Sequence, residues 1–217
     1  MNKEKDFLSG AELVCFDLDD TLVRGIHSMM YLAILVQKFP QFMRFEQMRN
    51  QFPSFLHGER AKLRLAKGLE ISVIEARFAK HFKQLRNIKE TVDRFHSMGI
   101  KCAVISTGPE PVVAAGCRLW GMDDYAGSKC EIVDGRLTGE YIEHMSEKGK
   151  KAALMSICER LATSPDKAIA VGDGFSDMEL FKACRTSVAL NPFDENVKKE
   201  TDYAFFTDDL MTVFFEE

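Results

Sequence analysis

Two short apolar segments, far apart in the chain, each run directly into paired aspartates. Residues 13–16 (LVCF) precede the acidic run 17–22 (DLDDTL), and residues 168–171 (AIAV) precede 172–177 (GDGFSD). Short apolar runs bounded by turn residues are typical of strands buried in a parallel sheet. Carboxylates at the mouth of such a strand are costly to desolvate unless a cation or hydrogen bonds compensate them, so the pattern points to chemistry.

The rest of the chain alternates between strand and helix patterns. The expected elements are a helix at 89–98, a strand at 101–106, a helix at 111–119, a hairpin within 129–142 that turns at Asp134-Gly135, a helix at 150–161, a strand at 168–171, a helix at 177–183 and strands at 187–190 and 203–206. This alternation predicts an α/β fold with a doubly wound, Rossmann-like parallel sheet.

One interruption follows the first strand. From 27 to 85 no strand pattern is visible, and Phe, Met and Leu recur with helical spacing between turn residues. The sequence therefore predicts a small all-helical cap domain at 25–85, inserted into a core domain formed by 1–24 and 86–217. The apolar residues of the insert are expected to form a core of its own.

Charge is distributed unevenly over the 217 residues, whose net charge is −4. Residues 25–87 hold eleven Lys and Arg against four Glu, and the remainder holds eighteen Lys and Arg against twenty-nine Asp and Glu. The surplus of +7 at 25–87 is either a solvated helix surface or a field that steers anionic ligands, and the sequence leaves both readings open.

Location and partners follow from what the sequence lacks. The six cysteines show no C-x-x-C spacing, which favours reduced thiols in the core. No apolar run approaches the roughly 18 residues of a transmembrane segment, so we expect a cytoplasmic protein. Nucleic acid is not an expected partner, because the basic surplus lies in one insert without a recognised binding motif and the whole chain is acidic.

Polar residues gather where the expected strands end. Asp17, Asp19, Ser106, Asp173 and Asp177 all follow strand patterns, and open α/β sheets bind ligands beyond those ends. Two carboxylates about 4 Å apart repel by about 4 kcal/mol at an effective dielectric constant of about 20. Asp17 and Asp173 could therefore not both stay ionised unaided, and a divalent cation would resolve this. All-oxygen ligation without paired His or Cys favours Mg²⁺.

Four motifs in this order resemble those of the haloacid dehalogenase superfamily, in its phosphatase branch. Residues 17–22 are similar to the first motif, 106–108 (STG) to the second, a lysine near 150 to the third and 172–177 to the fourth. The helical insert is similar to the small C1-type cap of the phosphoserine-phosphatase-like subgroup, as is the segment 106–111 (STGPEP). The resemblance covers almost the whole chain.

The resemblance implies a Mg²⁺-dependent phosphomonoester hydrolase. Asp17 would be the nucleophile that forms an aspartyl-phosphate, and Asp19 would protonate the leaving oxygen and later activate water. The side chains of Asp17 and Asp173 would bind the metal, and Asp19 would contact it only through its backbone carbonyl. Asp177 would lie behind them, holding metal-bound water or Lys150.

The same resemblance implies a phosphate-binding set. Ser106 would donate its hydroxyl to a phosphoryl oxygen, helped by the backbone N–H groups of Thr107 and Gly108 at the start of a helix. Lys150 would neutralise charge on the phosphoryl group. Helix phase selects Lys150, because the apolar residues four, seven and eleven positions later share its face, but Lys148 stays open as the lysine of the third motif.

The insert would choose the leaving group. Phosphoserine phosphatases carry a glutamate nine residues after the nucleophile to read the amino group, and this chain has Ile26 there, so phosphoserine is not the expected substrate. The basic, Phe- and Met-rich insert indicates a leaving group with further negative charge or with apolar surface, such as a phospholipid head group, a sugar phosphate or another small phosphorylated metabolite. Arg60 and Arg64 are the candidate specificity residues.

Two other function classes remain open from the sequence. A phosphotransferase or mutase would use the same core residues with an acceptor other than water. A catalytically idle module would use the acidic cleft for a metal or the basic insert for an anionic partner. A dehalogenase is not expected, because such enzymes lack the second aspartate of the first motif and Asp19 is present.

Overall fold

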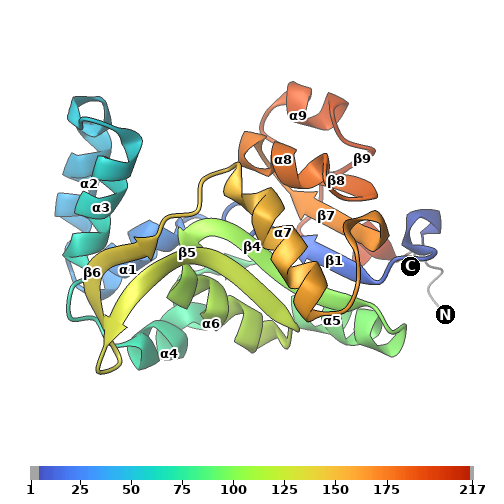
Figure 1. Ribbon diagram of the computed structural model, residues 1–217, viewed down its shortest axis with the longest axis horizontal. Helices are drawn as coiled ribbons and strands as arrows, with labels where there is room; N and C mark the ends of the chain where they lie inside the picture. The colour runs from blue at the N-terminus through green and yellow to red at the C-terminus, as the bar shows by residue number, and fades with distance from the viewer. Residues whose placement is uncertain (1–4, 216–217) are drawn as a thin grey trace.

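A seven-stranded sheet forms the centre of the protein, whose computed structural model describes residues 5–215 (Figure 1). The strand order is β6-β5-β4-β1-β7-β8-β9, and all neighbours are parallel except β5 and β6. The strands are β1 (Leu13–Phe16), β4 (Lys101–Pro109), β5 (Asp124–Val133), β6 (Arg136–Glu143), β7 (Ala168–Gly172), β8 (Thr186–Leu190) and β9 (Tyr203–Phe205). The predicted doubly wound α/β fold is confirmed.

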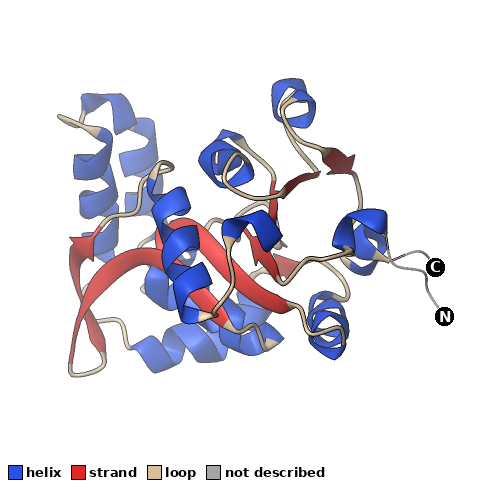
Figure 2. Cartoon of the chain, turned by 45° about the vertical axis from the view of Figure 1, so that its right-hand side comes forward, coloured by secondary structure: helices blue, strands red, loops and turns tan. Residues whose placement is uncertain are grey.

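Helices cover both faces of this sheet (Figure 2). One face packs on α5 (Ile88–Ser97), α6 (Glu110–Trp120) and α10 (Met211–Phe214), and the other on α7 (Gly149–Arg160), α8 (Met178–Phe181) and α9 (Glu195–Lys199). Strand β1 alternates between the two cores and all four of its residues are buried. Burial on both faces explains why the sequence of this strand is continuously apolar.

Four α-helices occupy the segment predicted to be helical. They are α1 (Ser28–Leu35), α2 (Phe39–Gln47), α3 (Phe55–Leu65) and α4 (Ile71–His81). The prediction of no strand between 27 and 85 is wrong at one point, because β3 (Lys83–Gln84) pairs antiparallel with β2 (Val23–Arg24). Two residues are too few to show a period, so a strand of this length leaves no pattern in the sequence.

The inserted helices do not form a separate apolar core, which corrects a second expectation. Their buried residues belong to the same cluster as those of α5 and α6. The link runs through Phe78 on α4, whose ring lies 5.6 Å from that of Trp120 and packs against Gly116. A Cβ atom at 116 would lie 2.9 Å from the Trp120 ring and 3.0 Å from the Phe78 ring, closer than van der Waals contact, so glycine permits this close approach.

A long β-hairpin reaches below α2 and α3 of the insert (Figure 1). Strands β5 and β6 turn at Asp134-Gly135, where both residues have positive φ as a tight hairpin turn requires. The tip and the start of β6 exchange backbone hydrogen bonds with the loop between α3 and α4 and with the first residue of α4. These bonds are Gly68 N–H to Leu137 O at 2.7 Å, Leu137 N–H to Leu69 O at 2.9 Å, and Ile71 N–H to Gly135 O at 3.0 Å. Three backbone bonds thus join the insert to the sheet.

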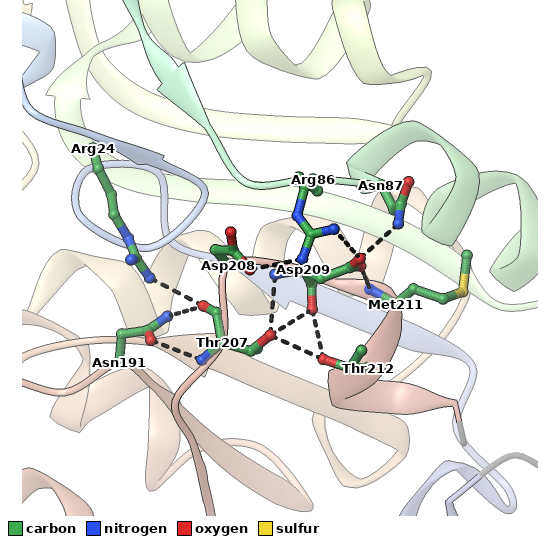
Figure 3. A network of polar contacts seen from close by, with 9 residues as sticks. All are labelled: Arg24, Arg86, Asn87, Asn191, Thr207, Asp208, Asp209, Met211 and Thr212. Carbon is green, nitrogen blue, oxygen red and sulfur yellow. Dashed lines mark hydrogen bonds and ion pairs between the residues drawn. The ribbon is translucent and has the colours of Figure 1, made fainter. Parts of the chain in front are cut away.

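The two connections between sheet and insert rest on the C-terminal segment (Figure 3). Arg24 donates to the carbonyl oxygen of Thr207 at 3.4 Å, Arg86 to Asp208 at 2.8 Å and Asn87 to Asp209 at 2.8 Å. These contacts fix both ends of the insert to the same part of the core.

None of the described helices is long and apolar enough to span a membrane. All six cysteines are free thiols, and only Cys184 is not fully buried.

Candidate active site

The two acidic motifs meet at the carboxyl edge of the sheet. Because β1 and β7 are adjacent and parallel, they deliver Asp17 and Asp173 side by side, and the Asp17 N–H donates to Val171 O at 2.8 Å. Asp177 joins them from the short turn of helix that follows β7. Each of the three buried carboxylates offers an oxygen within 4.8 Å of the others.

One buried lysine lies among these carboxylates. Lys150, in the first turn of α7, is 1% exposed, and its Nζ lies 2.5 Å from Asp17 Oδ1 and 2.6 Å from Asp177 Oδ1. Lys148, two residues earlier, is exposed on the cavity wall. Of the two candidate lysines, the structure brings Lys150 against Asp17.

Electrostatics at this edge favour a cation. Burial raises the pKa of Asp17 well above its usual range even though Lys150 opposes the shift, and burial with the neighbouring Asp177 raises the pKa of Asp173 to about 6. Burial would lower the pKa of Lys150, but the two carboxylates outweigh it and raise that pKa. A single positive charge among three carboxylates leaves a negative site that a divalent cation would neutralise.

The free donor atoms show which residues fit a metal ion. Both oxygens of Asp177 already accept hydrogen bonds, one from Lys150 and the other from the backbone N–H groups of Asp173 and Gly174 at 3.2 Å. Asp17 Oδ2 has only a long contact of 3.4 Å with Thr21, and Asp173 Oδ2 accepts no hydrogen bond from residues 5–215. These two oxygens fit direct ligation of Mg²⁺, with Asp177 behind them.

The raised pKa of Asp173 predicts how stability depends on pH without metal. Between about pH 4 and pH 6 the folded protein keeps a proton that the unfolded chain has lost, so rising pH lowers the free energy of unfolding, by up to about 3 kcal/mol for this group. We expect this loss in urea denaturation of the native protein in EDTA. The Asp173→Asn variant should lack the part of this pH-dependent loss that comes from Asp173. Identical profiles of the free energy of unfolding against pH for the two proteins would contradict the raised pKa of Asp173.

Asp19 is not one of the three clustered carboxylates. Its side chain accepts hydrogen bonds from the Ser28 N–H at 2.8 Å and the Ser28 hydroxyl at 2.7 Å, at the start of α1. Burial nevertheless raises the pKa of Asp19 above its ordinary value, against these hydrogen bonds. A carboxyl that retains its proton more readily, and that is separate from the metal-binding oxygens, suits general acid chemistry.

Part of the second motif lies in a different element from the one expected. Ser106 lies in the strand, as predicted, but Thr107 and Gly108 also belong to the end of β4 and not to the start of a helix, because α6 begins only at Glu110. The pairing of β4 with β5 shifts register across these residues, as often happens beside active sites. Ser106 is 1% exposed, its Oγ accepts the Gly108 N–H at 3.1 Å, and all three residues line the cavity.

Two buried side chains at the site were not predicted from the sequence to have a role there. Thr21 is fully buried and donates to Asp173 Oδ1 at 3.0 Å, and Ser28 is fully buried and orients Asp19. Thr21 lies within the first motif, which is the only sequence signal for it. Ser28 lies outside every motif, and nothing in the sequence marks it.

A cavity of about 1220 Å³ opens above the carboxylates and reaches between the insert and the hairpin. Asp17, Asp19, Ser106 and Asp173 form its inner end. The structure brings one of the two candidate specificity residues to it: Arg60 lines the cavity, whereas Arg64 is not among the lining residues and its Nε donates to Glu140 on β6 at 2.8 Å.

The chain is similar in sequence to curated phosphoserine phosphatases. Relatives include phosphoserine phosphatase SerB2 of Mycobacterium tuberculosis, 26% identical over 82% of this chain and 44% of its own, and the phosphoserine phosphatase of Archaeoglobus fulgidus, 29% identical over 88% of this chain and 54% of its own. This chain thus spans about half the length of the curated relatives it matches.

Solved structures show the same fold. A phospho-aspartyl intermediate analogue of phosphoserine phosphatase superposes with a TM-score of 0.72, covering 94% of this chain and 97% of its own at 24% identity. A probable phosphoserine phosphatase from Vibrio cholerae gives 0.77, covering 95% and 64% at 22% identity. The family model for haloacid dehalogenase-like hydrolases matches residues 14–182, which include all four motifs. The chain therefore belongs to the haloacid dehalogenase-like hydrolase family.

Proposed function

We propose that this protein is a Mg²⁺-dependent phosphomonoester hydrolase that works through an aspartyl-phosphate. The observation that carries the proposal is the arrangement around Asp17. Its carboxylate is fixed by Lys150 on one oxygen and lies beside Asp173 on the metal side, while Asp19 is oriented separately by Ser28. A nucleophile, a cation site and an independent proton donor are the parts that such a reaction needs.

The reaction has two steps. In the first, an Asp17 carboxylate oxygen attacks phosphorus, the bond from phosphorus to the ester oxygen breaks, and Asp19 gives its proton to the departing oxygen. In the second, Asp19 takes a proton from water as that water attacks the same phosphorus, which releases inorganic phosphate and restores Asp17. The raised pKa of Asp19 supplies the protonated form for the first step.

The surrounding residues position the phosphoryl group. Ser106 at the end of β4 would donate its hydroxyl to a phosphoryl oxygen, with Thr107 and Gly108 beside it on the cavity wall. Lys150 would hold Asp17 in place and offset charge on the transferred group. A Mg²⁺ ion bound by Asp17, Asp173 and the backbone carbonyl of Asp19 would supply electrostatic stabilisation of the phosphoryl oxygens.

Residues 25–85 act in this proposal as the cap over a core of 1–24 and 86–217. The cavity extends from the carboxylates into the inserted helices, so a leaving group attached to the phosphate would contact the cap. The substrate is accordingly a small phosphate monoester, either a phosphorylated metabolite or a phospholipid head group.

Phosphate release from phenyl phosphate tests the proposal. We expect turnover with millimolar Mg²⁺, loss of more than about 99% of it in EDTA, and recovery when Mg²⁺ is restored, because the carboxylate cluster cannot approach a phosphate dianion without a cation. Thermal unfolding in EDTA should confirm that the metal-free protein is still folded. Turnover that persists undiminished in EDTA would refute the metal requirement, and absence of turnover under all conditions would refute the hydrolase.

A further inference from the structure

The cavity above the carboxylates is larger and more apolar than a serine leaving group needs. Its volume of about 1220 Å³ exceeds the roughly 300–1000 Å³ typical of pockets for drug-sized ligands. Beyond the catalytic end, its wall carries apolar side chains from α1, α2, α3 and β6, which are Met29, Met30, Phe42, Met43, Leu56 and Tyr141.

The positive surplus of the insert is not directed into this cavity. Of the eleven Lys and Arg residues at 25–87, only Arg60 and Lys62 line the wall, and Glu46 and Glu59 line it with them. Lys62 is bound to both glutamates, at 2.6 Å from Glu46 and in closer contact with Glu59. The charges of the insert that face the cavity therefore balance, and the reading in which the cap attracts a second anionic group loses its support.

The apolar wall also continues outward to the surface. Phe55 on α3 and Ile142 on β6 both line the cavity and are 74% and 71% exposed. Phe55 meets His144 across the gap between the insert and the hairpin, with ring centroids 6.1 Å apart. Exposed apolar side chains at the mouth of an apolar cavity extend the surface that a long ligand could cover.

We propose that this site takes phosphate monoesters whose leaving group carries an extended apolar segment, several carbon atoms long. The inference rests on the proposed hydrolase function and specifies its substrate class. The phosphoryl group lies against Asp17 and Ser106, and the apolar segment runs along Met30, Phe42 and Met43 toward Phe55. Each methylene group that leaves water for this wall strengthens binding of the reacting complex.

A series of primary alkyl phosphates tests the inference. Ethyl, n-butyl and n-hexyl phosphate, with O-phosphoserine beside them, share a primary alkoxide leaving group, so their intrinsic reactivities are similar. We expect kcat/KM to rise by up to about fourfold per buried methylene group, and by at least about tenfold from ethyl to n-hexyl phosphate. 3-Phenylpropyl phosphate distinguishes a wall that fits a flexible chain from one that fits a ring, and a rise with either compound supports the inference.

Matched variants on α2 locate the effect. Met43→Gln replaces a methionine that lines the cavity, and Met48→Gln replaces one at the end of the same helix that is 43% exposed and outside the lining. The ratio of kcat/KM for n-hexyl to ethyl phosphate should fall several-fold in Met43→Gln and stay at the native value in Met48→Gln. Equal kcat/KM across the native series, or equal ratios in both variants, would overturn the inference while turnover of ethyl phosphate leaves the hydrolase proposal intact.

Discussion

Replacing Asp17 with asparagine is expected to lower Mg²⁺-dependent phosphate release by at least about a thousandfold. The amide cannot attack phosphorus to form an acyl-phosphate, and loss of a nucleophile that acts as a unit with its partners removes most of the catalysis. The substitution preserves the shape of the buried side chain, and Lys150 keeps its second partner, Asp177, at 2.6 Å. Single-turnover and steady-state release from phenyl phosphate measure the effect.

The control for this variant is Asp93→Asn. Asp93 is an exposed aspartate on α5 whose carboxylate pairs with Lys89, far from the catalytic edge in sequence and on another element. Its release of phosphate should match that of the native protein. If Asp17→Asn stays folded by circular dichroism and still turns over within tenfold of native, Asp17 is not the nucleophile.

Replacing Lys150 with methionine is expected to have the largest effect on stability. Lys150 is 1% exposed and hydrogen-bonds both Asp17 and Asp177, so its removal leaves two buried carboxylates without their cation. Breaking one side of a buried ion pair costs about 3–5 kcal/mol. Urea denaturation in EDTA should show that loss, because Mg²⁺ would partly replace the missing charge.

Lys148→Met is the matched comparison and separates the two lysines that the sequence leaves open. Lys148 is exposed on the cavity wall, and an exposed lysine contributes little to stability. Its variant should unfold within about 0.5 kcal/mol of the native protein. Equal destabilisation by the two substitutions would show that helix phase does not identify the inward lysine.

The central sheet could be predicted because buried parallel strands are continuously apolar in sequence. The run 13–16 is apolar throughout since β1 is covered on both faces, and its parallel pairing with β7 places Asp17 beside Asp173 by topology alone. The sequence also predicts the turn at Asp134-Gly135, because few residue pairs adopt two successive positive φ values.

Features set by tertiary contacts left no comparable signal. The pairing of β2 with β3 involves two residues on each side, and the role of Ser28 depends on where α1 begins relative to Asp19. Residues 107–108 look like the start of a helix, yet pairing with β5 on either side of them keeps them in the strand. Such features follow from neighbours distant in the chain, which local patterns do not encode.

The sequence also does not predict which way a charged side chain points. Arg60 and Arg64 lie one turn apart on α3, yet Arg60 lines the cavity and Arg64 pairs with Glu140. The net charge of a segment gives its surplus of cations over anions and not which way the side chains point, so the +7 surplus at 25–87 does not identify the ligand.

The hairpin beneath the insert has a consequence for exchanging parts between family members. Its bonds through Gly68, Leu69 and Ile71 mean that the inserted helices are completed by β6, a strand translated some fifty residues after α4 ends. A chimaera that transplants 25–85 alone would place these helices against the hairpin of another protein, without their three native backbone hydrogen-bond partners. The unit to transfer is therefore the discontinuous pair of 25–85 and the hairpin, which carries both sides of these backbone bonds.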